Sequence, residues 1–236
     1  MPRAGQGPML STMRPNSPQH LAHGKAAKWD TSGVLLDESA SQGLLDWAKI
    51  FGNTHPVEIE IGTGKGTFLL ARAAGRPEVN FFGIEFARAY CRYTADRLRR
   101  RGLTNVRVAQ AEAAAFFKVC LADASVWRVH IYFPDPWPKR RHRRRRLIQP
   151  PFARNVRRVL RAGGQLIIVT DHIGYFRQIH NVLSSVPGLA PVSAPRMAGL
   201  STDPQRADGE LVGTNFERKY ITQGRSFYAA AWLRYA

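Results

Sequence analysis

Cysteine is scarce in this chain, and long apolar runs are missing from it. Cys91 and Cys120 are the two cysteines among 236 residues, and they lie far apart in the sequence. Such a pair predicts neither a zinc site nor a disulfide framework, and it suits a reducing cytoplasm. No stretch approaches about 18 uninterrupted apolar residues, so we expect no membrane span. The first residues also lack the apolar core of a signal peptide, which favours a cytoplasmic protein.

Acidic residues are few relative to basic ones. Lysine and arginine number 35 against 17 aspartates and glutamates, which gives a formal net charge of +18. An excess of this size is not typical of metabolic enzymes, and it indicates a polyanionic partner, most simply a nucleic acid. Apolar residues make up 44% of the chain, which is enough for a full core in one large domain.

The first 32 residues differ in composition from the rest. They are rich in proline, glycine, serine, glutamine and lysine, which predicts a mobile basic tail at 1–32 followed by a single domain at 33–236. Arg14, Lys25 and Lys28 could contact RNA weakly, and disorder without a function explains the composition equally well.

Strand-like and helix-like segments alternate from residue 57 onward. Short β-rich apolar runs are followed by segments of helical periodicity, which is typical of βαβ units and predicts an α/β fold with a mostly parallel sheet. The predicted strands are residues 57–61, 80–85, 105–109, 129–133, 165–171 and 226–235. The predicted helices are residues 43–51, 66–74, 88–101, 113–121, 150–161 and 175–184.

Acidic side chains gather at the ends of the predicted strands. Ligands bind at the carboxyl ends of parallel strands in folds of this class. Five acids on one edge of a very basic protein are unlike a random solvated surface. These acids are Glu60, Glu85, Glu112, Asp135 and Asp171.

A glycine-rich turn follows the first strand, at residues 60–66 with the sequence EIGTGKG. Glycines let the backbone approach a ligand closely. The dinucleotide-binding fingerprint requires a third glycine three residues after Gly64, where this chain has Thr67. A phosphate-binding P-loop fails as well, because Ile59 replaces its first glycine and Gly66 replaces its serine or threonine. The turn therefore predicts a ligand of another kind, or a purely structural role.

The most unusual stretch is FPDPWPKRRHRRRR at residues 133–146. Two prolines flank Asp135, and since proline fixes φ near −65° they hold this carboxylate in a pre-set turn. A block of cations follows from Lys139 to Arg146, interrupted by His142. A rigid carboxylate beside an anion-binding block indicates chemistry on a nucleic acid. The alternative is a capped turn followed by a solvated run of charge.

The order of these motifs resembles a known enzyme class. An acid, three spaced glycines and a second acid at the end of the next strand resemble the class I S-adenosylmethionine-dependent methyltransferases. With FPDPWPK, the basic run and TNFERK near the end, the chain resembles the bacterial tRNA (guanine-N7-)-methyltransferases of the TrmB type, from about Leu45 to Tyr228. The resemblance implies a Rossmann-like, mostly parallel seven-stranded sheet with helices on both faces.

The resemblance also implies which residues bind S-adenosyl-L-methionine and tRNA. Asp135 would be the catalytic acid. The implied cofactor-binding residues are Glu60, Gly62, Gly64, Glu85, Glu112 and Asp135. The implied substrate-binding residues are Lys139, Asp171, Thr214, Asn215, Phe216 and Glu217. The implied RNA-binding residues are Arg141, His142, Arg143, Arg144, Arg145 and Arg146.

Two features depart from the family pattern. The third pocket acid is usually aspartate, and the longer Glu112 changes the reach of its contact with the adenine amino group. The arginine run is also denser than the family requires. No metal-binding cluster is expected among the seven histidines, and the sequence leaves the oligomeric state open.

The implied reaction needs no general base. Guanine N7 carries a lone pair and no proton, so the main task is to align N7, the methyl group and the sulfur. Asp135 could stabilise the developing positive charge or accept hydrogen bonds from the guanine N1–H and amino group. The target implied by the family is the guanosine at position 46 in the variable loop. The alternatives are methylation of another RNA, of protein or of a small molecule, and RNA binding without catalysis.

Overall fold

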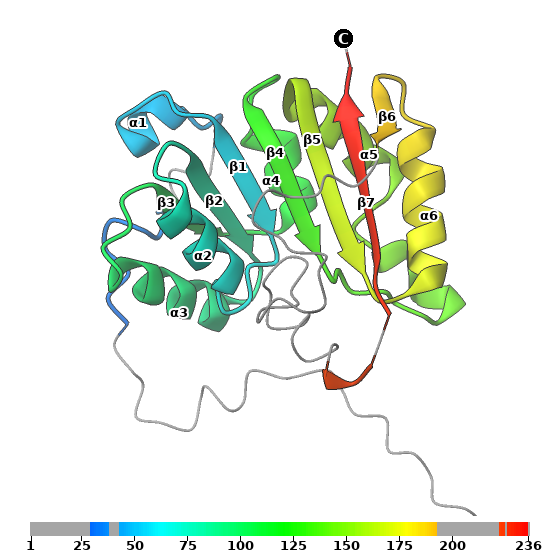
Figure 1. Cartoon of the computed structure of the whole chain (residues 1–236), viewed down its shortest axis with the longest axis horizontal. Coiled ribbons are helices and arrows are strands. Elements are labelled where there is room, and N and C mark those ends of the chain that lie inside the picture. The colour runs from blue at the N-terminus through cyan, green and yellow to red at the C-terminus, as the bar shows by residue number, and fades with distance from the viewer. Residues whose placement is uncertain (1–28, 38–42, 193–221, 225, 236) are drawn as a thin grey trace, which may run out of the picture.

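The computed structural model describes residues 29–37, 43–192, 222–224 and 226–235. Its centre is a seven-stranded sheet with the strand order β3-β2-β1-β4-β5-β7-β6 (Figure 1). The strands are β1 (Val57–Ile61), β2 (Asn80–Glu85), β3 (Val106–Gln110), β4 (Val126–Tyr132), β5 (Leu160–Thr170), β6 (Leu189–Val192) and β7 (Tyr228–Arg234). The helices are α1 (Trp47–Phe51), α2 (Thr67–Gly75), α3 (Arg88–Arg99), α4 (Ala113–Val119), α5 (Pro150–Val159), α6 (Ile173–Ser184) and a 3₁₀ helix at Arg140–Arg145.

The strand directions confirm the predicted α/β class and its mostly parallel sheet. Strands β1 to β5 pair in parallel, and β7 is antiparallel to both of its neighbours, β5 and β6. The carboxyl ends of β1, β2, β4 and β5 therefore point to one edge, and β7 runs the opposite way (Figure 1). The short strand β6 was missed, because its four residues include a proline and lack a strand-like pattern.

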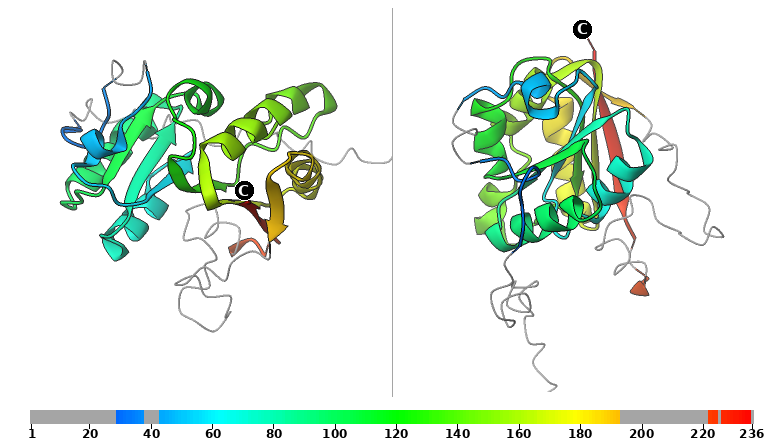
Figure 2. Two further views of the ribbon diagram at one scale, coloured as in Figure 1. Left: turned by 90° about the horizontal axis from the view of Figure 1, so that it is seen from above. Right: turned by 90° about the vertical axis from the view of Figure 1, so that its left-hand side faces the viewer.

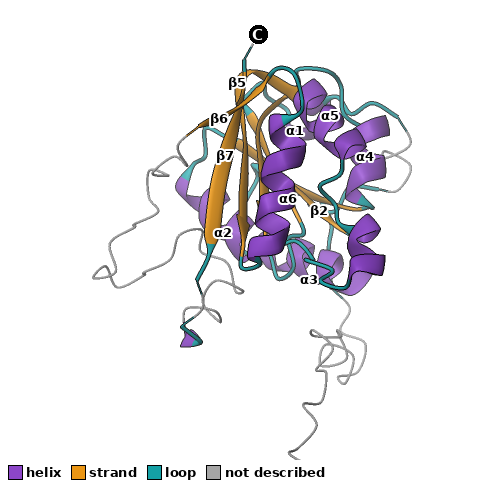
Figure 3. Cartoon of the chain, turned by 90° about the vertical axis from the view of Figure 1, so that its right-hand side faces the viewer, coloured by secondary structure: helices purple, strands orange, loops and turns teal. Residues whose placement is uncertain are grey.

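Helices cover both faces of the sheet, as predicted. The larger core lies between the sheet and α1, α4, α5 and α6, and the second core lies under α2 and α3. Figure 3 shows α4, α5 and α6 on one side of the sheet with α2 on the other, and Figure 2 gives two further views of these layers. The apolar residues of β1 at 57, 59 and 61 face the larger core, so Glu58 and Glu60 face α2.

Tertiary contacts moved several predicted boundaries. The helix predicted at 43–51 begins at Trp47, because the Leu45 N–H donates to the Cys120 carbonyl at 2.8 Å and Asp46 caps the first turn. The helix predicted at 150–161 ends at Val159, because Leu160 pairs with Val126 and starts β5. Gly163 and Gly164, which follow the predicted helix in the sequence, therefore lie inside β5.

The N-terminal boundary also differs in detail. Trp29 packs edge-on against Tyr93 of α3, and Asp30 pairs with Arg99 at 3.2 Å. Residues 29–32 thus contact the domain ahead of the predicted start at 33, and residues 1–28 lie outside the described part of the chain. Among the helices that the structure describes, none has the length and apolar character needed to span a bilayer.

Candidate active site

The strand order brings the five predicted acids to one edge of the sheet. Each lies at or just beyond the carboxyl end of a parallel strand, from β3 across to β5. The chain crosses from one side of β1 to the other between β3 and β4, and folds of this class bind ligands at such a point. Along this edge the acids follow the order Glu112, Glu85, Glu60, Asp135 and Asp171.

The glycine turn after β1 adopts a backbone that requires glycine. Gly62, Gly64 and Gly66 have φ values of 78°, 53° and 69°, which other residues rarely adopt. A Cβ atom on Gly66 would also lie 2.5 Å from Cγ2 of Thr94 in α3, closer than any real contact. The turn can therefore approach both α3 and a ligand more closely than a turn with side chains.

Side chains from β2 and α3 hold this turn in place. The Gly64 N–H donates to Oε2 of Glu85 at 2.8 Å, and the Ala87 N–H donates to Oε1 at 2.9 Å. The Thr94 hydroxyl donates to the Gly64 carbonyl at 2.8 Å, and Arg97 donates to the Lys65 carbonyl at the same distance. The two predicted cofactor-binding segments are thus joined through the Glu85 carboxylate.

Glu60 is a buried acid with an unused oxygen. Its side chain lies at the end of β1 with 3% exposure, and Oε2 has no hydrogen-bond partner among the described residues. Burial, and then the nearby Glu85 carboxylate, raises the pKa of Glu60 well above its ordinary value. A buried acid with a raised pKa and a free oxygen favours a ligand that brings a cation or a hydrogen-bond donor to that oxygen.

Glu112 takes a role that the sequence did not indicate. It is the N-cap of α4, where Oε1 accepts from the Ala114 N–H at 2.9 Å and Oε2 accepts from the Ala115 N–H at 2.7 Å. Both oxygens are therefore engaged by the backbone, each with a lone pair to spare. The predicted contact with an adenine amino group stays a prediction.

Asp135 lies in a tight turn directly after β4. The turn is entered at Phe133 and left at Trp137, whose φ values of 51° and 38° are strained for residues other than glycine. The Phe133 N–H donates to the Val169 carbonyl at 2.7 Å, which joins the start of the turn to β5. The Asp135 side chain is exposed at the tip. A carboxylate is thus presented on a stiff support at the edge where ligands bind.

The cation run forms a 3₁₀ helix beside this turn. The side chains of Arg140, Arg141, Arg143, Arg144 and Arg145 are exposed, and Lys139 before them is exposed as well. Desolvation, and then the surrounding cations, lowers the pKa of His142. The ring of Trp137 lies 5.8 Å from the His142 ring and 5.0 Å from the Arg145 guanidinium, so it packs against the run.

Comparison with known proteins identifies the family. A family model described as "Putative methyltransferase" matches residues 54–230. The tRNA (guanine-N(7)-)-methyltransferase of Geobacter metallireducens is 37% identical over 201 residues, which cover 84% of this chain and 91% of the relative. The protein of the same name from Leifsonia xyli is 42% identical over 167 residues, covering 71% and 72% of the two chains. The chain belongs to this methyltransferase family.

Solved structures agree with the fold of a methyltransferase. The antibiotic-resistance methyltransferase Kmr superposes with a TM-score of 0.54 at 16% identity, covering 82% of this chain and 98% of Kmr. Phosphoethanolamine N-methyltransferase 2 of Haemonchus contortus, solved with S-adenosyl-L-methionine, superposes with a TM-score of 0.50 at 16% identity, covering 80% and 51%. The predicted class I methyltransferase fold is confirmed.

Arg146, the last residue of the cation run, is buried, whereas the arginines just before it are exposed. Arg146, expected to meet RNA, has 3% exposure and donates through Nε to the Pro136 carbonyl at 2.7 Å. Its side chain is folded under the turn because it is the first residue after the 3₁₀ helix, where the chain re-enters the core at Ile148. This guanidinium is thus engaged by the protein itself, and the RNA contact expected of Arg146 stays a prediction.

The remaining predicted substrate residues are placed only in part. Asp171 follows β5 and is half-buried, next to His172, whose Nδ1 accepts from the Tyr175 N–H at the start of α6. Thr214, Asn215, Phe216 and Glu217 lie outside the described residues. The roles predicted for these side chains and for Lys139 stay predictions.

Sequence reasoning missed a buried charge layer beneath α2. Glu58, with 1% exposure, accepts from Arg76 and Arg128 at 3.0 Å each, and its Oε2 lies 2.9 Å from Nε2 of His130. The His130 Nδ1 in turn lies 2.7 Å from the Tyr132 hydroxyl. The signal was present in β1, where two acids alternate with apolar residues in a strand that is buried throughout.

The charge state of this layer follows from its contacts. Burial opposes ionisation of Glu58, but the hydrogen bond from His130 and the charges of Arg128 and Arg72 outweigh it and lower its pKa to about 2. Burial lowers the pKa of His130, so the ring is neutral and donates Nε2–H to Glu58. Nδ1 then accepts from the Tyr132 hydroxyl, so both ring nitrogens of His130 form hydrogen bonds.

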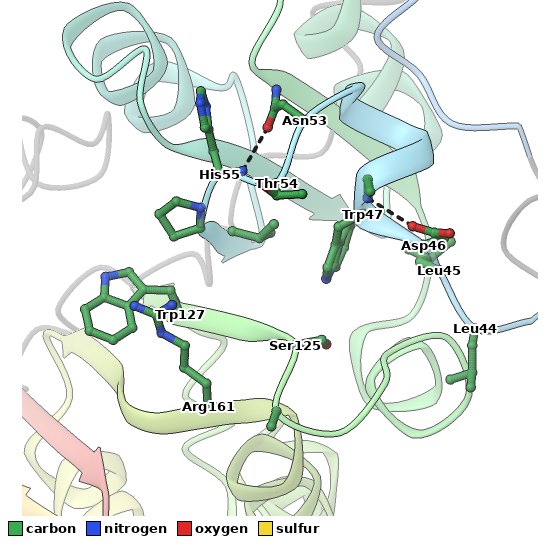
Figure 4. A pocket seen from close by; sticks show the side chains of 14 residues that line it. Leu44, Leu45, Asp46, Trp47, Asn53, Thr54, His55, Ser125, Trp127 and Arg161 are labelled. Carbon is green, nitrogen blue, oxygen red and sulfur yellow. Dashed lines mark hydrogen bonds between the residues drawn. The ribbon is translucent and has the colours of Figure 1, made fainter.

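A surface pocket of about 550 Å³ lies away from this site. It opens near the amino ends of β1 and β4, and its walls include Trp47, His55 and Trp127 (Figure 4). Arg161 stacks on Trp127 with its guanidinium carbon 3.7 Å from the ring centroid. None of the predicted site residues that the structure describes lines this pocket, and it lies at the opposite edge of the sheet from the five acids.

Proposed function

We propose that this protein transfers the methyl group of S-adenosyl-L-methionine to N7 of a guanosine in tRNA and so forms N7-methylguanosine. The target proposed from the family resemblance is the guanosine at position 46 of the variable loop, and the proposed location is the cytoplasm. The observation that carries the proposal is the juxtaposition, in one turn and the helix after it, of the rigid Asp135 carboxylate and an exposed run of arginines.

The residues at the sheet edge fit the proposed cofactor. S-adenosyl-L-methionine offers an ammonium group, two ribose hydroxyls and an adenine amino group, all of which donate hydrogen bonds. The unpartnered Oε2 of Glu60 suits a donor that carries positive charge. Glu85 is proposed to accept from the ribose and Glu112 from the adenine, with Gly62 and Gly64 lining the backbone approach. When bound, the cofactor supplies a methyl group activated by the sulfonium.

The proposed chemistry depends on alignment and on electrostatics. Guanine N7 attacks without losing a proton, so the protein must hold the base with N7 in line with the methyl group and the sulfur. The base becomes cationic, and Asp135 faces this change from a fixed position. Its carboxylate is proposed either to stabilise the developing charge or to orient the guanine through N1–H and the amino group.

The exposed cations are proposed to hold the tRNA backbone. Arg141, Arg143, Arg144 and Arg145 are exposed on the 3₁₀ helix next to the turn, and the half-buried His142 between them is proposed to contact the RNA as well. Phosphate contacts position a nucleic acid and carry little sequence information. Lys139, Asp171 and residues 214–217 are proposed to contact the target nucleotide.

The test is methylation of unmodified tRNA by the purified protein with labelled S-adenosyl-L-methionine. We expect label in tRNA, chemical cleavage at the modified guanosine of the variable loop, and loss of both in the Asp135→Asn variant. Label in protein, or in an RNA other than tRNA, would support the alternative methyltransferases instead. Tight tRNA binding without methyl transfer would contradict the proposal.

A further inference from the structure

Arg146 is a buried cation at the end of an exposed cationic run. Its neighbours Arg143, Arg144 and Arg145 are exposed, whereas Arg146 has 3% exposure. Removing a guanidinium from water is costly unless its donors are paired. The fold must therefore provide partners for Arg146, and these partners reveal its task.

The partners of Arg146 come from the catalytic turn and from α6. Its Nε donates to the Pro136 carbonyl at 2.7 Å, and its Nη1 donates to Oε1 of Gln178 at 2.6 Å. Its guanidinium carbon lies 4.7 Å from the centroid of the Tyr175 ring, within the range of a cation–π contact. One side chain thus connects the residue next to Asp135 with two residues of α6.

The α6 side of this connection is itself held in place. The Ile148 N–H donates to the Tyr175 hydroxyl at 3.1 Å, and the Gln178 amide donates to the Ile148 carbonyl at 3.2 Å. Tyr175 is fully buried in the larger core. The guanidinium therefore rests against a rigid surface, and the Pro136 carbonyl is held at a defined distance from it.

The turn needs such support because its backbone is strained. Phe133 and Trp137 both have positive φ, a conformation that is unfavourable for residues other than glycine. Strain of this kind persists only where the surroundings determine the conformation. The Phe133 N–H fixes the start of the turn to β5, and the bond from Arg146 to Pro136 fixes its end. Asp135 lies between these two attachments.

We infer that Arg146 is a positioning residue for Asp135 and does not bind phosphate. The inference rests on the function proposed above. The cationic run then has two parts: exposed residues that hold the RNA backbone, and one buried residue that sets where the reacting acid stands. A small displacement of a catalytic group can lower a rate by about 100-fold.

The deciding variant is Arg146→Lys, which keeps the charge but cannot donate in two fixed directions at once. We expect the single-turnover rate at saturating tRNA and cofactor to fall by about 10-fold to 100-fold. The dissociation constant for tRNA should stay within about threefold of wild type, because no phosphate contact is lost. The matched variant Arg144→Ala should instead weaken tRNA binding and make its salt dependence shallower, because an exposed phosphate contact is lost.

A double-mutant cycle separates positioning from general support of the fold. If Arg146 acts through Asp135, Arg146→Lys should cost little further rate in an Asp135→Asn background. Melting temperature and calorimetric binding of S-adenosylhomocysteine show whether each variant is folded. If Arg146→Lys is not folded, Gln178→Met removes one of its two acceptors and enters the same cycle, with a smaller loss of rate expected.

The outcomes that overturn the inference are distinct from failure of the proposed function. A wild-type protein that does not methylate tRNA contradicts the proposed function. A wild-type protein that does so, together with an Arg146→Lys variant that reacts at the wild-type rate but binds tRNA weakly, shows that Arg146 is a phosphate ligand. Independent, multiplying losses in the cycle show that Arg146 does not act through Asp135.

Discussion

The buried charge layer under α2 and the acidic edge of the sheet each take one glutamate from β1, and the two glutamates differ in their partners and in the direction of their pKa shifts. Glu58 has Arg76, Arg128 and His130 as partners, and its pKa is lowered to about 2. Glu60, two residues further along β1 and facing the same side, has an oxygen without a partner in the described chain, and its pKa is raised.

The difference in partners between Glu58 and Glu60 distinguishes an acid that stabilises the fold from one that is available to a ligand. A buried acid with three partners contributes to folding, whereas a buried acid without one costs folding free energy and is retained for another reason. We therefore interpret the buried charge layer around Glu58 as structural and the acids at the carboxyl ends of the strands as functional. Four changes test or sharpen this division.

Asp135→Asn should have the largest effect. The change keeps the shape of the side chain and deletes its charge, and loss of one preorganised electrostatic contact lowers a rate by about 100-fold to 1,000-fold. Single-turnover methylation at saturating tRNA measures this. Because Asp135 is exposed and lies outside both cores, the melting temperature of the Asp135→Asn variant should match that of wild type. A rate within a few-fold of wild type would remove Asp135 from the reaction.

Glu58→Gln should act on stability instead. Removing the charge leaves Arg72, Arg76 and Arg128 without their shared anion, and we expect a loss of about 3 kcal/mol in the free energy of unfolding. Chemical denaturation at neutral pH measures it. A Glu58→Gln protein as stable as wild type but with impaired cofactor binding would reverse the division between the two regions.

The pH dependence of stability offers a second test of Glu58. Its pKa is lowered from 4.5 to about 2 on folding, so its contribution is fully present above pH 4.5 and is lost as the pH falls toward 2. Wild-type stability should decline across this window, and the decline should be shallower in Glu58→Gln.

Glu60→Gln should weaken cofactor binding without lowering stability, which is the reverse of the effect expected for Glu58→Gln. The variant removes an acid whose pKa is raised in the fold, and such an acid destabilises the folded state as the pH rises above 4.5. Stability at neutral pH should therefore rise or stay level. Affinity for S-adenosylhomocysteine should fall by about 10-fold to 100-fold, since a charged hydrogen bond is lost.

The same acid should make cofactor binding release protons. A ligand ammonium favours the ionised form of Glu60, so wild-type affinity should increase as the pH rises toward the raised pKa of Glu60. Calorimetry in buffers of different ionisation enthalpy measures the released protons. Proton release that persists in Glu60→Gln would assign it to another group.

Substitution of Arg143 and Arg144 by alanine should have the smallest effect on the reaction itself. Both side chains are exposed on the 3₁₀ helix and lack the ring contact that engages Arg145. If both touch phosphate, the slope of log affinity against log salt should flatten by about 0.7–0.9 for each contact. A salt titration of tRNA binding measures this, and chemical cleavage should still find the same modified guanosine. An unchanged slope would make these arginines a solvated surface.

Much of the fold was predictable because its signals are local. The strands at 57–61 and 80–85 were predicted at their exact bounds, since their apolar runs end at glycine or polar residues. The glycine turn was predictable for the same reason, because glycine occupies positions 62, 64 and 66, where the backbone has positive φ. The boundary at Leu160 was not, because it depends on pairing with Val126, which is 34 residues earlier in the chain.

The candidate site was predictable as a set of residues and not as a set of contacts. Strand ends alone indicated that Glu60, Glu85 and Asp135 share an edge. That Glu112 caps α4, and that Glu85 holds the glycine turn, required the neighbouring segments to be placed beside them. Residues of one chemical type can bind a ligand or the protein itself, and spacing does not distinguish these outcomes.

The sequence alone is sufficient to predict the α/β class, the glycine turn, the edge on which the acids gather and the strong positive charge. Each of these follows from periodicity, from backbone restrictions or from composition, which are properties of neighbouring residues. Which charged side chains have partners depends on the tertiary structure. Glu58 and Glu60 have the same side chain in the same strand, and Arg144 and Arg146 have the same side chain in the same run. Their environments differ because α2, β4 and α6 place donors, acceptors and rings beside one member of each pair, and burial then makes those contacts obligatory.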